Sequence, residues 1–232
     1  MDWLRWFRRA PPQETAAAPE KTLPASIERA APGVAALFGG LAEDGSHAVL
    51  DFGAAAEGSL RLYSRFARRI RFADMLTDPP RGEAWEAALQ ALPPHPDQQY
   101  DIVVAWNLLD RLAPEDRPPL IERLTQLTAP GARLYVLVDS SGEPESHPLH
   151  FSILGPDRVG QQTAGPSRPA QPQLLPAEVK RLLPPFRVEH AFTLRLGQRE
   201  YMAIRGRQKG VGSTPSPAPW PPSGKRGRGP GR

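Results

Sequence analysis

The sequence predicts an α/β domain, in which a doubly wound, mainly parallel sheet is followed by a C-terminal antiparallel hairpin. Short apolar runs alternate about five times with amphipathic stretches, as in parallel strands joined by helices. Residues 102–105 carry no polar side chain, which is typical of a strand buried on both faces of a sheet. Residues 187–196 and 199–205 form two strand-like runs around a short Gly-Gln turn, which predicts the hairpin.

The first half of the chain alternates strands and helices according to its apolar spacing. We expect a helix at 26–38, a strand at 48–52, a turn of small residues at 53–58, a helix at 59–69, a strand at 70–72, a helix at 83–92 and a strand at 100–106. Pro32 is a potential break in the first helix because proline removes a backbone donor and clashes with the preceding turn.

The second half continues the alternation and contains one irregular stretch. We expect a helix at 114–127, a strand at 132–138 and a helix that begins at Pro176, since proline suits the first turn of a helix. Residues 140–173 show no regular period, and we interpret them as a long polar connection. The chain of 232 residues therefore fits one domain at 24–206, preceded by an arm and linker at 1–23 and followed by a tail at 207–232.

Charge and composition restrict the class of function. The net charge is +4, but seven basic residues and no acidic one follow from Arg205 onward, which leaves about −3 for the rest of the chain. We therefore predict no specific nucleic-acid surface on the domain and a disordered tail rich in proline, glycine and basic residues. The chain has no cysteine, which excludes disulfides and thiol nucleophiles and fits a cytoplasmic protein.

Membrane contact is expected at most at the N-terminus. No apolar run reaches the length of roughly 20 residues that crosses a bilayer. The aromatic residues near Trp3 and Phe7 could form one face of a short interfacial helix, with arginines opposite. The alternative is an arm that packs loosely on the domain, since so short a helix is marginal alone.

The turn at 53–58 is the first candidate for a binding site. In an open parallel sheet, ligands bind beyond the carboxyl ends of the strands, where the strand order reverses. The first strand ends there in the acid Asp51, followed by Gly53, and glycine lets the backbone approach a ligand closely. Asp74 follows the second strand about twenty residues later, a spacing typical of an acid that binds a ribose.

These residues, together with a second stretch, resemble the class I S-adenosylmethionine-dependent methyltransferases. Asp51 and Gly53 match the first motif of that family, while Ala55 and Glu57 stand where it has further glycines. Residues 100–112 resemble the family's fourth strand and the loop after it, and residues 120–138 resemble the next helix, turn and strand. The resemblance covers about 160 residues and implies a Rossmann-like sheet of seven strands, of which the third is weak in this sequence.

The resemblance implies S-adenosylmethionine as the cofactor and an unidentified methyl acceptor as the partner. It implies a set of cofactor-binding residues: Asp51, Gly53, Ala55, Asp74, Trp106 and Asn107. Asp74 would accept hydrogen bonds from the two ribose hydroxyls, because a carboxylate has two acceptor oxygens. The alternative for Asp74 is a structural turn or helix cap, and the alternative for Asn107 is a cap of the next turn.

No catalytic residue is assigned from the sequence, and no metal site is expected. His147 and His150 lie in the irregular stretch and could take a proton from an acceptor, with surface histidines as the alternative. Pro148 between them argues against a helical pair of metal ligands, and no third ligand is evident.

Three functions remain open at this point. The first is methyl transfer, in which the protein mainly aligns the acceptor for attack on the methyl carbon. The second is a noncatalytic binding or scaffolding module of the same fold, which the replacements at Ala55 and Glu57 favour. The third is a nicotinamide dehydrogenase, because Gly53, Ala55 and Gly58 loosely match a dinucleotide turn.

Overall fold

The computed structural model describes residues 26–77, 82–92, 99–140 and 145–206. The arm at 1–23, its aromatic segment and the tail at 207–232 lie outside the described residues, as do Pro24 and Ala25. The helices are α1 (Pro32–Phe38), α2 (Glu57–Tyr63), α3 (Glu83–Ala91), α4 (Leu108–Arg111), α5 (Arg117–Leu127), α6 (Pro176–Leu182) and the 3₁₀ turn η1 (Arg195–Gly197).

Eleven strands are assigned within these residues. They are β1 (Ile27–Ala30), β2 (His47–Asp51), β3 (Ala67–Phe72), β4 (Tyr100–Val104), β5 (Thr128–Asp139), β6 (Glu145–Ser146), β7 (Leu149–Gly155), β8 (Arg158–Thr163), β9 (Arg168–Pro169), β10 (Phe186–Thr193) and β11 (Gln198–Arg205).

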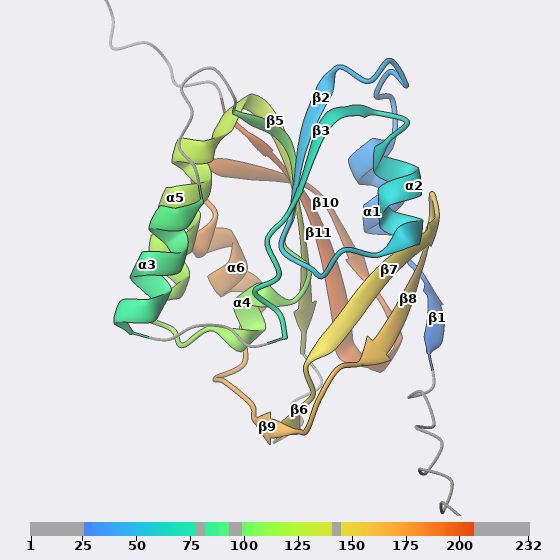
Figure 1. Ribbon diagram of the computed structural model, residues 1–232. Coiled ribbons are helices and arrows are strands. Elements are labelled where there is room, and N and C mark those ends of the chain that lie inside the picture. The colour runs from blue at the N-terminus through green and yellow to red at the C-terminus, as the bar shows by residue number, and fades with distance from the viewer. Residues whose placement is uncertain (1–25, 78–81, 93–98, 141–144, 207–232) are drawn as a thin grey trace, which may run out of the picture.

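A six-stranded sheet in the order β10-β11-β5-β4-β2-β3 forms the centre of the domain (Figure 1). β3, β2, β4 and β5 run parallel, and β11 is antiparallel to both β5 and β10. This arrangement confirms the predicted mainly parallel sheet with a terminal hairpin. Within the described residues the sheet has six strands rather than the expected seven, because none occurs between α3 and β4; residues 93–98 lie outside that description.

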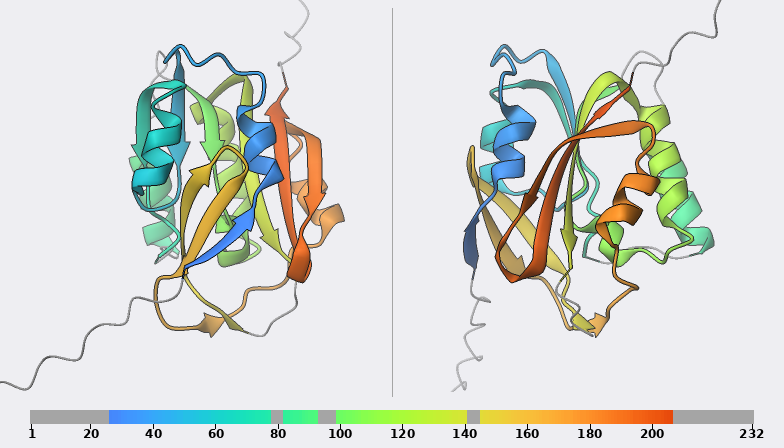
Figure 2. Two further views of the ribbon diagram at one scale, coloured as in Figure 1. Left: turned by 90° about the vertical axis from the view of Figure 1, so that its right-hand side faces the viewer. Right: turned by 180° about the vertical axis from the view of Figure 1, so that it is seen from behind.

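Helices cover both faces of this sheet, as a doubly wound fold requires. α1 and α2 lie on one face, and α3, α5 and α6 lie on the other (Figures 1 and 2). The buried apolar residues form one continuous cluster, to which the central strands contribute fully buried side chains such as Val49, Val103 and Leu134. Burial on both faces explains why these strands read as apolar runs without alternation.

The irregular stretch at 140–173 was interpreted wrongly, because it contains a second sheet. β7 and β8 form an antiparallel hairpin, and β1 adds to the free side of β8 in the order β1-β8-β7. This small sheet lies on the same side of the central sheet as α1 and α2 (Figure 2). The alternating apolar residues Leu149, Phe151 and Ile153, followed by Gly155-Pro156, are the signal that could have predicted the hairpin.

Two predicted helix boundaries are also corrected. The segment 26–38 is a strand, β1, followed by α1, and Pro32 starts that helix instead of breaking it. Pairing with the unrecognised strand β8 overrides the helical spacing of β1. The helix expected at 59–69 begins earlier and ends at Tyr63, because residues 67–72 all belong to β3.

A buried carboxylate joins the two sheets and α1. Glu200 in β11 is fully buried and accepts hydrogen bonds from Tyr135 of β5 at 2.8 Å and from the backbone N–H of Gly33 at 2.6 Å. It also forms an ion pair of 2.8 Å with Arg29 of β1. These contacts hold β1 and α1 against the sheet, which in turn fixes where the small sheet lies.

Candidate functional site

The site expected from the sequence lies where the strand order reverses, between β2 and β4. These two strands are parallel neighbours, and Asp51 at the end of β2 pairs in register with Val104 at the end of β4. β3 ends on the other side of β2, with Asp51 in register with Phe72. The carboxyl ends of three parallel strands therefore meet at one edge, which is where open α/β sheets bind ligands.

Asp51 is fully engaged by the protein itself. Its Oδ1 accepts hydrogen bonds from the backbone N–H of Gly53 at 2.7 Å and from the indole N–H of Trp106 at 2.6 Å. Its Oδ2 accepts one from the hydroxyl of Tyr63 at 2.6 Å. Burial raises the pKa of Asp51 to about 6, although these three hydrogen bonds act in the opposite direction. Asp51, with 1% of its surface exposed, therefore holds the turn, Trp106 and Tyr63 together from inside the domain.

The indole of Trp106 lies over Gly53. A Cβ atom at Gly53 would lie 2.9 Å from Nε1 of Trp106, so this glycine accommodates the indole. Trp106 is fully buried, has a positive φ of 47° and stacks on Phe151 of β7, with ring centres 4.7 Å apart and planes 3° apart. A backbone in the left-handed region is uncommon for a bulky residue and indicates that the surroundings hold it there.

The rest of the turn separates into an open part and a packed part. Ala54, Ala55 and Ala56 line a cavity, with Ala55 exposed. Glu57 points away from the turn, since its side chain is exposed and pairs with Arg61. Its charge therefore does not occupy the turn.

Gly58 is explained by packing between elements. A Cβ atom there would lie 2.2 Å from the carbonyl oxygen of Ile153, so only glycine lets α2 approach β7 this closely. This contact removes the main reason for interpreting Gly58 as part of a dinucleotide turn. α2 has seven residues, so it offers only a short N-terminal turn to a ligand.

Asp74 follows β3 and is exposed. Its Oδ1 accepts hydrogen bonds from the backbone N–H groups of Leu76 and Thr77, at 3.2 and 3.3 Å, so the turn role considered as an alternative is present. Thr77 also donates its hydroxyl to Oδ2 of Asp74 at 3.0 Å. The same hydroxyl lies 2.9 Å from Nε2 of His150, which connects the turn after β3 to β7.

Asn107 follows Trp106 and occupies the N-cap position of α4, but its side chain makes no capping hydrogen bond. Asn107 is 8% exposed, and its Oδ1 has no hydrogen-bond partner among the described residues. A buried, unpaired acceptor is costly, so this atom is available to a donor from a ligand or a water.

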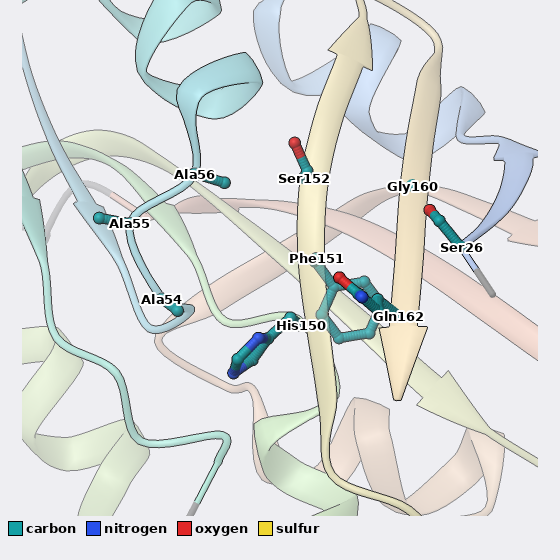
Figure 3. A pocket seen from close by; sticks show the side chains of 9 residues that line it. All are labelled: Ser26, Ala54, Ala55, Ala56, His150, Phe151, Ser152, Gly160 and Gln162. Atoms are coloured by element: carbon teal, nitrogen blue, oxygen red, sulfur yellow. The ribbon is translucent and has the colours of Figure 1, made fainter. Parts of the chain in front are cut away.

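The cavity beside the alanine turn has a volume of about 240 Å³ and is lined by nine residues from three parts of the chain (Figure 3). They are Ser26, Ala54, Ala55, Ala56, His150, Phe151, Ser152, Gly160 and Gln162. The sequence analysis placed Ala54, Ala55 and Ala56 in the candidate turn at 53–58, named Ala55 as a cofactor-binding residue and considered His150 as an open alternative. The other five lining residues were not predicted, because β1, β7 and β8 were not recognised as strands.

A second, partly buried acid lies at the ends of β4 and β5. Asp110 in α4 accepts a hydrogen bond from the backbone N–H of Asp139 at 2.7 Å. Burial raises the pKa of Asp110 to about 7, and the neighbouring Asp139 adds to that increase. Nearby, His147 is exposed and its Nδ1 is 3.5 Å from the carbonyl oxygen of Gly165.

Within the described ranges, no three or more histidine, aspartate or glutamate side chains gather as metal ligands would. No helix in the part of the chain that the structure covers is long and apolar enough to span a bilayer.

Comparison of the sequence with models of known families gives no match, and neither does comparison with curated proteins. Comparison of the structure finds similar folds. A S-adenosylmethionine-dependent methyltransferase from Mesorhizobium loti is 15% identical, with a TM-score of 0.47, over 75% of this chain and 96% of the other. The 1,6-didemethyltoxoflavin-N1-methyltransferase of Burkholderia thailandensis, with bound S-adenosylhomocysteine, is 16% identical, with a TM-score of 0.45, over 76% and 77%.

The pyocyanin biosynthetic protein PhzM is 17% identical, with a TM-score of 0.40 over 75% of this chain. The chain spans about half, 54%, of that protein. All three TM-scores are below 0.5. The doubly wound α/β architecture is established by the sheet order of the chain itself.

Proposed function

We propose that this domain binds S-adenosylmethionine at the edge formed by β3, the alanine turn and β4, and transfers its methyl group to an acceptor. The observation that carries the proposal is Asp74, an exposed carboxylate beyond β3, beside the point where the strand order reverses. A carboxylate can accept about four hydrogen bonds, and Oδ2 of Asp74 receives the hydroxyl of Thr77, so this oxygen has acceptor capacity left for a ribose hydroxyl.

Two further features of the edge fit this cofactor. The unpaired Oδ1 of Asn107 can accept a hydrogen bond at the end of β4. The small side chains of Ala54, Ala55 and Ala56 leave the backbone of the turn accessible beside the cavity. When bound, the cofactor would supply a methyl group on a positively charged sulfur, so the protein needs chiefly to align the acceptor.

One feature limits how the cofactor can lie. The indole of Trp106 occupies the space over Gly53. Both carboxylate oxygens of Asp51 already accept hydrogen bonds from the protein. We therefore propose that the methionine part lies along Ala54–Ala56 and not against Gly53, and that Asp51 and Trp106 support the turn without touching the ligand. Asp74, Asn107 and Ala55 would make the contacts.

Calorimetry with S-adenosylhomocysteine tests the proposal. The variant Asp74→Asn should weaken binding roughly ten-fold or more, since about 1.4 kcal/mol corresponds to ten-fold and one hydrogen bond contributes about this much. The matched control is Asp44→Asn, because Asp44 is also an exposed turn aspartate, bonded to the N–H of Ser46, but precedes β2 at the opposite edge. Equal binding by both variants would contradict the proposal.

The noncatalytic module is the second candidate, and Trp106 favours it. The stack of Trp106 on Phe151 closes the space over Gly53 with the protein's own side chains. If the wild-type protein gives no heat with S-adenosylhomocysteine at millimolar concentration, this candidate replaces the first.

A further inference from the structure

The cavity beside the alanine turn has a floor formed by facing residues of one hairpin. His150 of β7 pairs in register with Gln162 of β8, and Ser152 pairs with Gly160. Side chains two residues apart on a strand share a face, so these four positions lie on one side of the hairpin. Figure 3 shows them opposite Ala54, Ala55 and Ala56, with the His150 ring below the turn.

Gly160 keeps this floor open. Its φ is not in the left-handed region, so its backbone does not demand glycine. A Cβ atom there would meet the side chains of Leu154 and Ser26 at 3.4 Å, which is close to ordinary contact. A side chain larger than a hydrogen atom would therefore narrow the cavity at a cost that the fold can tolerate.

The hydrogen bonds of Thr77 determine which nitrogen of His150 carries the proton. An ionised carboxylate only accepts, so the single hydroxyl proton of Thr77 goes to Asp74. The oxygen of Thr77 must then accept from Nε2 of His150, which lies 2.9 Å away. Nε2 consequently carries hydrogen, and in the neutral imidazole Nδ1 keeps its lone pair.

We propose that this cavity is a binding site for a small uncharged hydroxyl compound, whose O–H donates to Nδ1 of His150. The lining supports this class of ligand: it offers an imidazole, an amide and two serine hydroxyls, with no charged side chain among its nine residues. A cavity of 240 Å³ is slightly below the usual range for ligand sites of roughly 300–1,000 Å³, which restricts the ligand to a small molecule.

The role of this compound rests on the proposed methyl transfer, in which it is the methyl acceptor and His150 is the catalytic base. The acceptor oxygen would form its bond to the methyl carbon while the carbon–sulfur bond breaks and its electron pair stays on sulfur. The hydroxyl proton would pass to Nδ1 of His150. Thr77 acts here as a positioning residue, since it holds the ring through Nε2.

The tautomer of His150 can be read without any cofactor. Long-range proton–nitrogen NMR of the full chain, with the His150 signals assigned by their loss in His150→Gln, should show hydrogen on Nε2 and a lone pair on Nδ1. Thr77→Val keeps the shape of the side chain but removes the oxygen, and should reduce this preference to that of an unconstrained imidazole. Hydrogen on Nδ1 in the wild type, or an unchanged preference in Thr77→Val, would overturn the proposal.

Phenol and anisole provide the test of binding. Phenol has an O–H donor, whereas anisole carries a methyl group on the same oxygen and cannot donate. Phenol should shift the Nδ1 signal of His150 saturably, and anisole should not. Gly160→Ala should weaken the phenol effect several-fold while leaving the His150 tautomer unchanged. Equal shifts with both probes, or none with phenol up to its solubility limit, would overturn the site.

These measurements separate the two proposals. Phenol binding without binding of S-adenosylhomocysteine would refute the methyl transfer and leave a hydroxyl-compound site. Binding of S-adenosylhomocysteine without phenol binding would refute the present site alone.

Discussion

The indole N–H of Trp106 donates to the buried carboxylate of Asp51 at 2.6 Å, joining the ends of β4 and β2. Two neighbouring strands are thereby tied at the point where a doubly wound sheet places its ligand. Tyr63 of α2 donates to the same carboxylate, so the helix after the turn is also anchored to this group. The shape of the turn therefore depends on a single buried acid.

Removing the Trp106 hydrogen bond should destabilise the fold more than removing an unpaired indole N–H. Trp106→Phe loses a donor to a buried carboxylate, which is worth about 1.5–3 kcal/mol. Trp85→Phe is the matched control, because Trp85 is 1% exposed and its Nε1 has no partner within the described structure. Urea unfolding of both variants should show a loss larger by about 2 kcal/mol for Trp106→Phe; equal losses would contradict this role.

The raised pKa of Asp51 predicts a pH dependence of stability. The folded pKa is about 6 against an ordinary value of 3.8, so the native state binds this proton more tightly. The resulting stabilisation is full below pH 3.8 and is lost as the pH rises through 6, a change of about 3 kcal/mol for two pKa units. Asp51→Asn removes the titration.

The comparison of wild type and Asp51→Asn isolates this group. Relative to the variant, the wild-type free energy of unfolding should fall by up to about 3 kcal/mol between pH 4 and 7. Asp110, whose pKa is also raised, is present in both proteins, so its contribution cancels. A difference that stays constant with pH, or changes in the opposite direction, would show that Asp51 is not desolvated as described.

The sequence predicted the edge of the sheet well, because strand ends follow from local apolar runs. Asp51 was expected at the end of one strand and Asn107 directly after another; Asp51 ends β2, and Asn107 follows its neighbour β4 as the N-cap residue of α4. The partners of Asp51 could not be predicted in the same way. Nothing local in the sequence indicates that the hydroxyl of Tyr63 meets an acid twelve residues away.

The small sheet of β1, β8 and β7 beside the site was not predicted, for a different reason. β1 is paired to β8, more than 120 residues later, and such pairing depends on the assembled fold and not on local preference. Phe151 is fixed by its stack on Trp106, a contact that only the hairpin makes available. The sequence therefore indicated where a ligand could bind, but not which side chains surround that place.

The close contact of α2 with β7 predicts a severe effect at Gly58. In Gly58→Ala the new Cβ would lie 2.2 Å from the carbonyl oxygen of Ile153, so α2 and the small sheet must separate. Overpacking of this kind costs about 1–3 kcal/mol, and backbone on one side leaves little room to relax. Gly155→Ala is the control, because a Cβ atom there meets nothing within 4 Å. Thermal unfolding should separate the two variants clearly, and a Gly58→Ala protein as stable as Gly155→Ala would refute the contact.

The buried Glu200 predicts a further contrast between two ion pairs of β1. Glu200→Gln should lower the free energy of unfolding by about 3–5 kcal/mol. The reason is that Glu200 is fully buried and its replacement leaves the charge of Arg29 without a partner. Glu28→Gln removes the partner of Arg158, but both side chains of that pair are about half exposed, so a loss of about 0–1 kcal/mol is expected.

Urea unfolding at neutral pH measures both losses, and hydrogen exchange of β1 locates them. Because Glu200 also accepts from the N–H of Gly33, its replacement should increase exchange at the start of α1 and along β1 before the central strands are affected. Glu28→Gln should leave exchange at Gly33 unchanged, since its pair with Arg158 connects only β1 and β8. Similar losses in both variants, or exchange that increases first in β4, would mean that Glu200 does not hold β1 and α1 against the sheet.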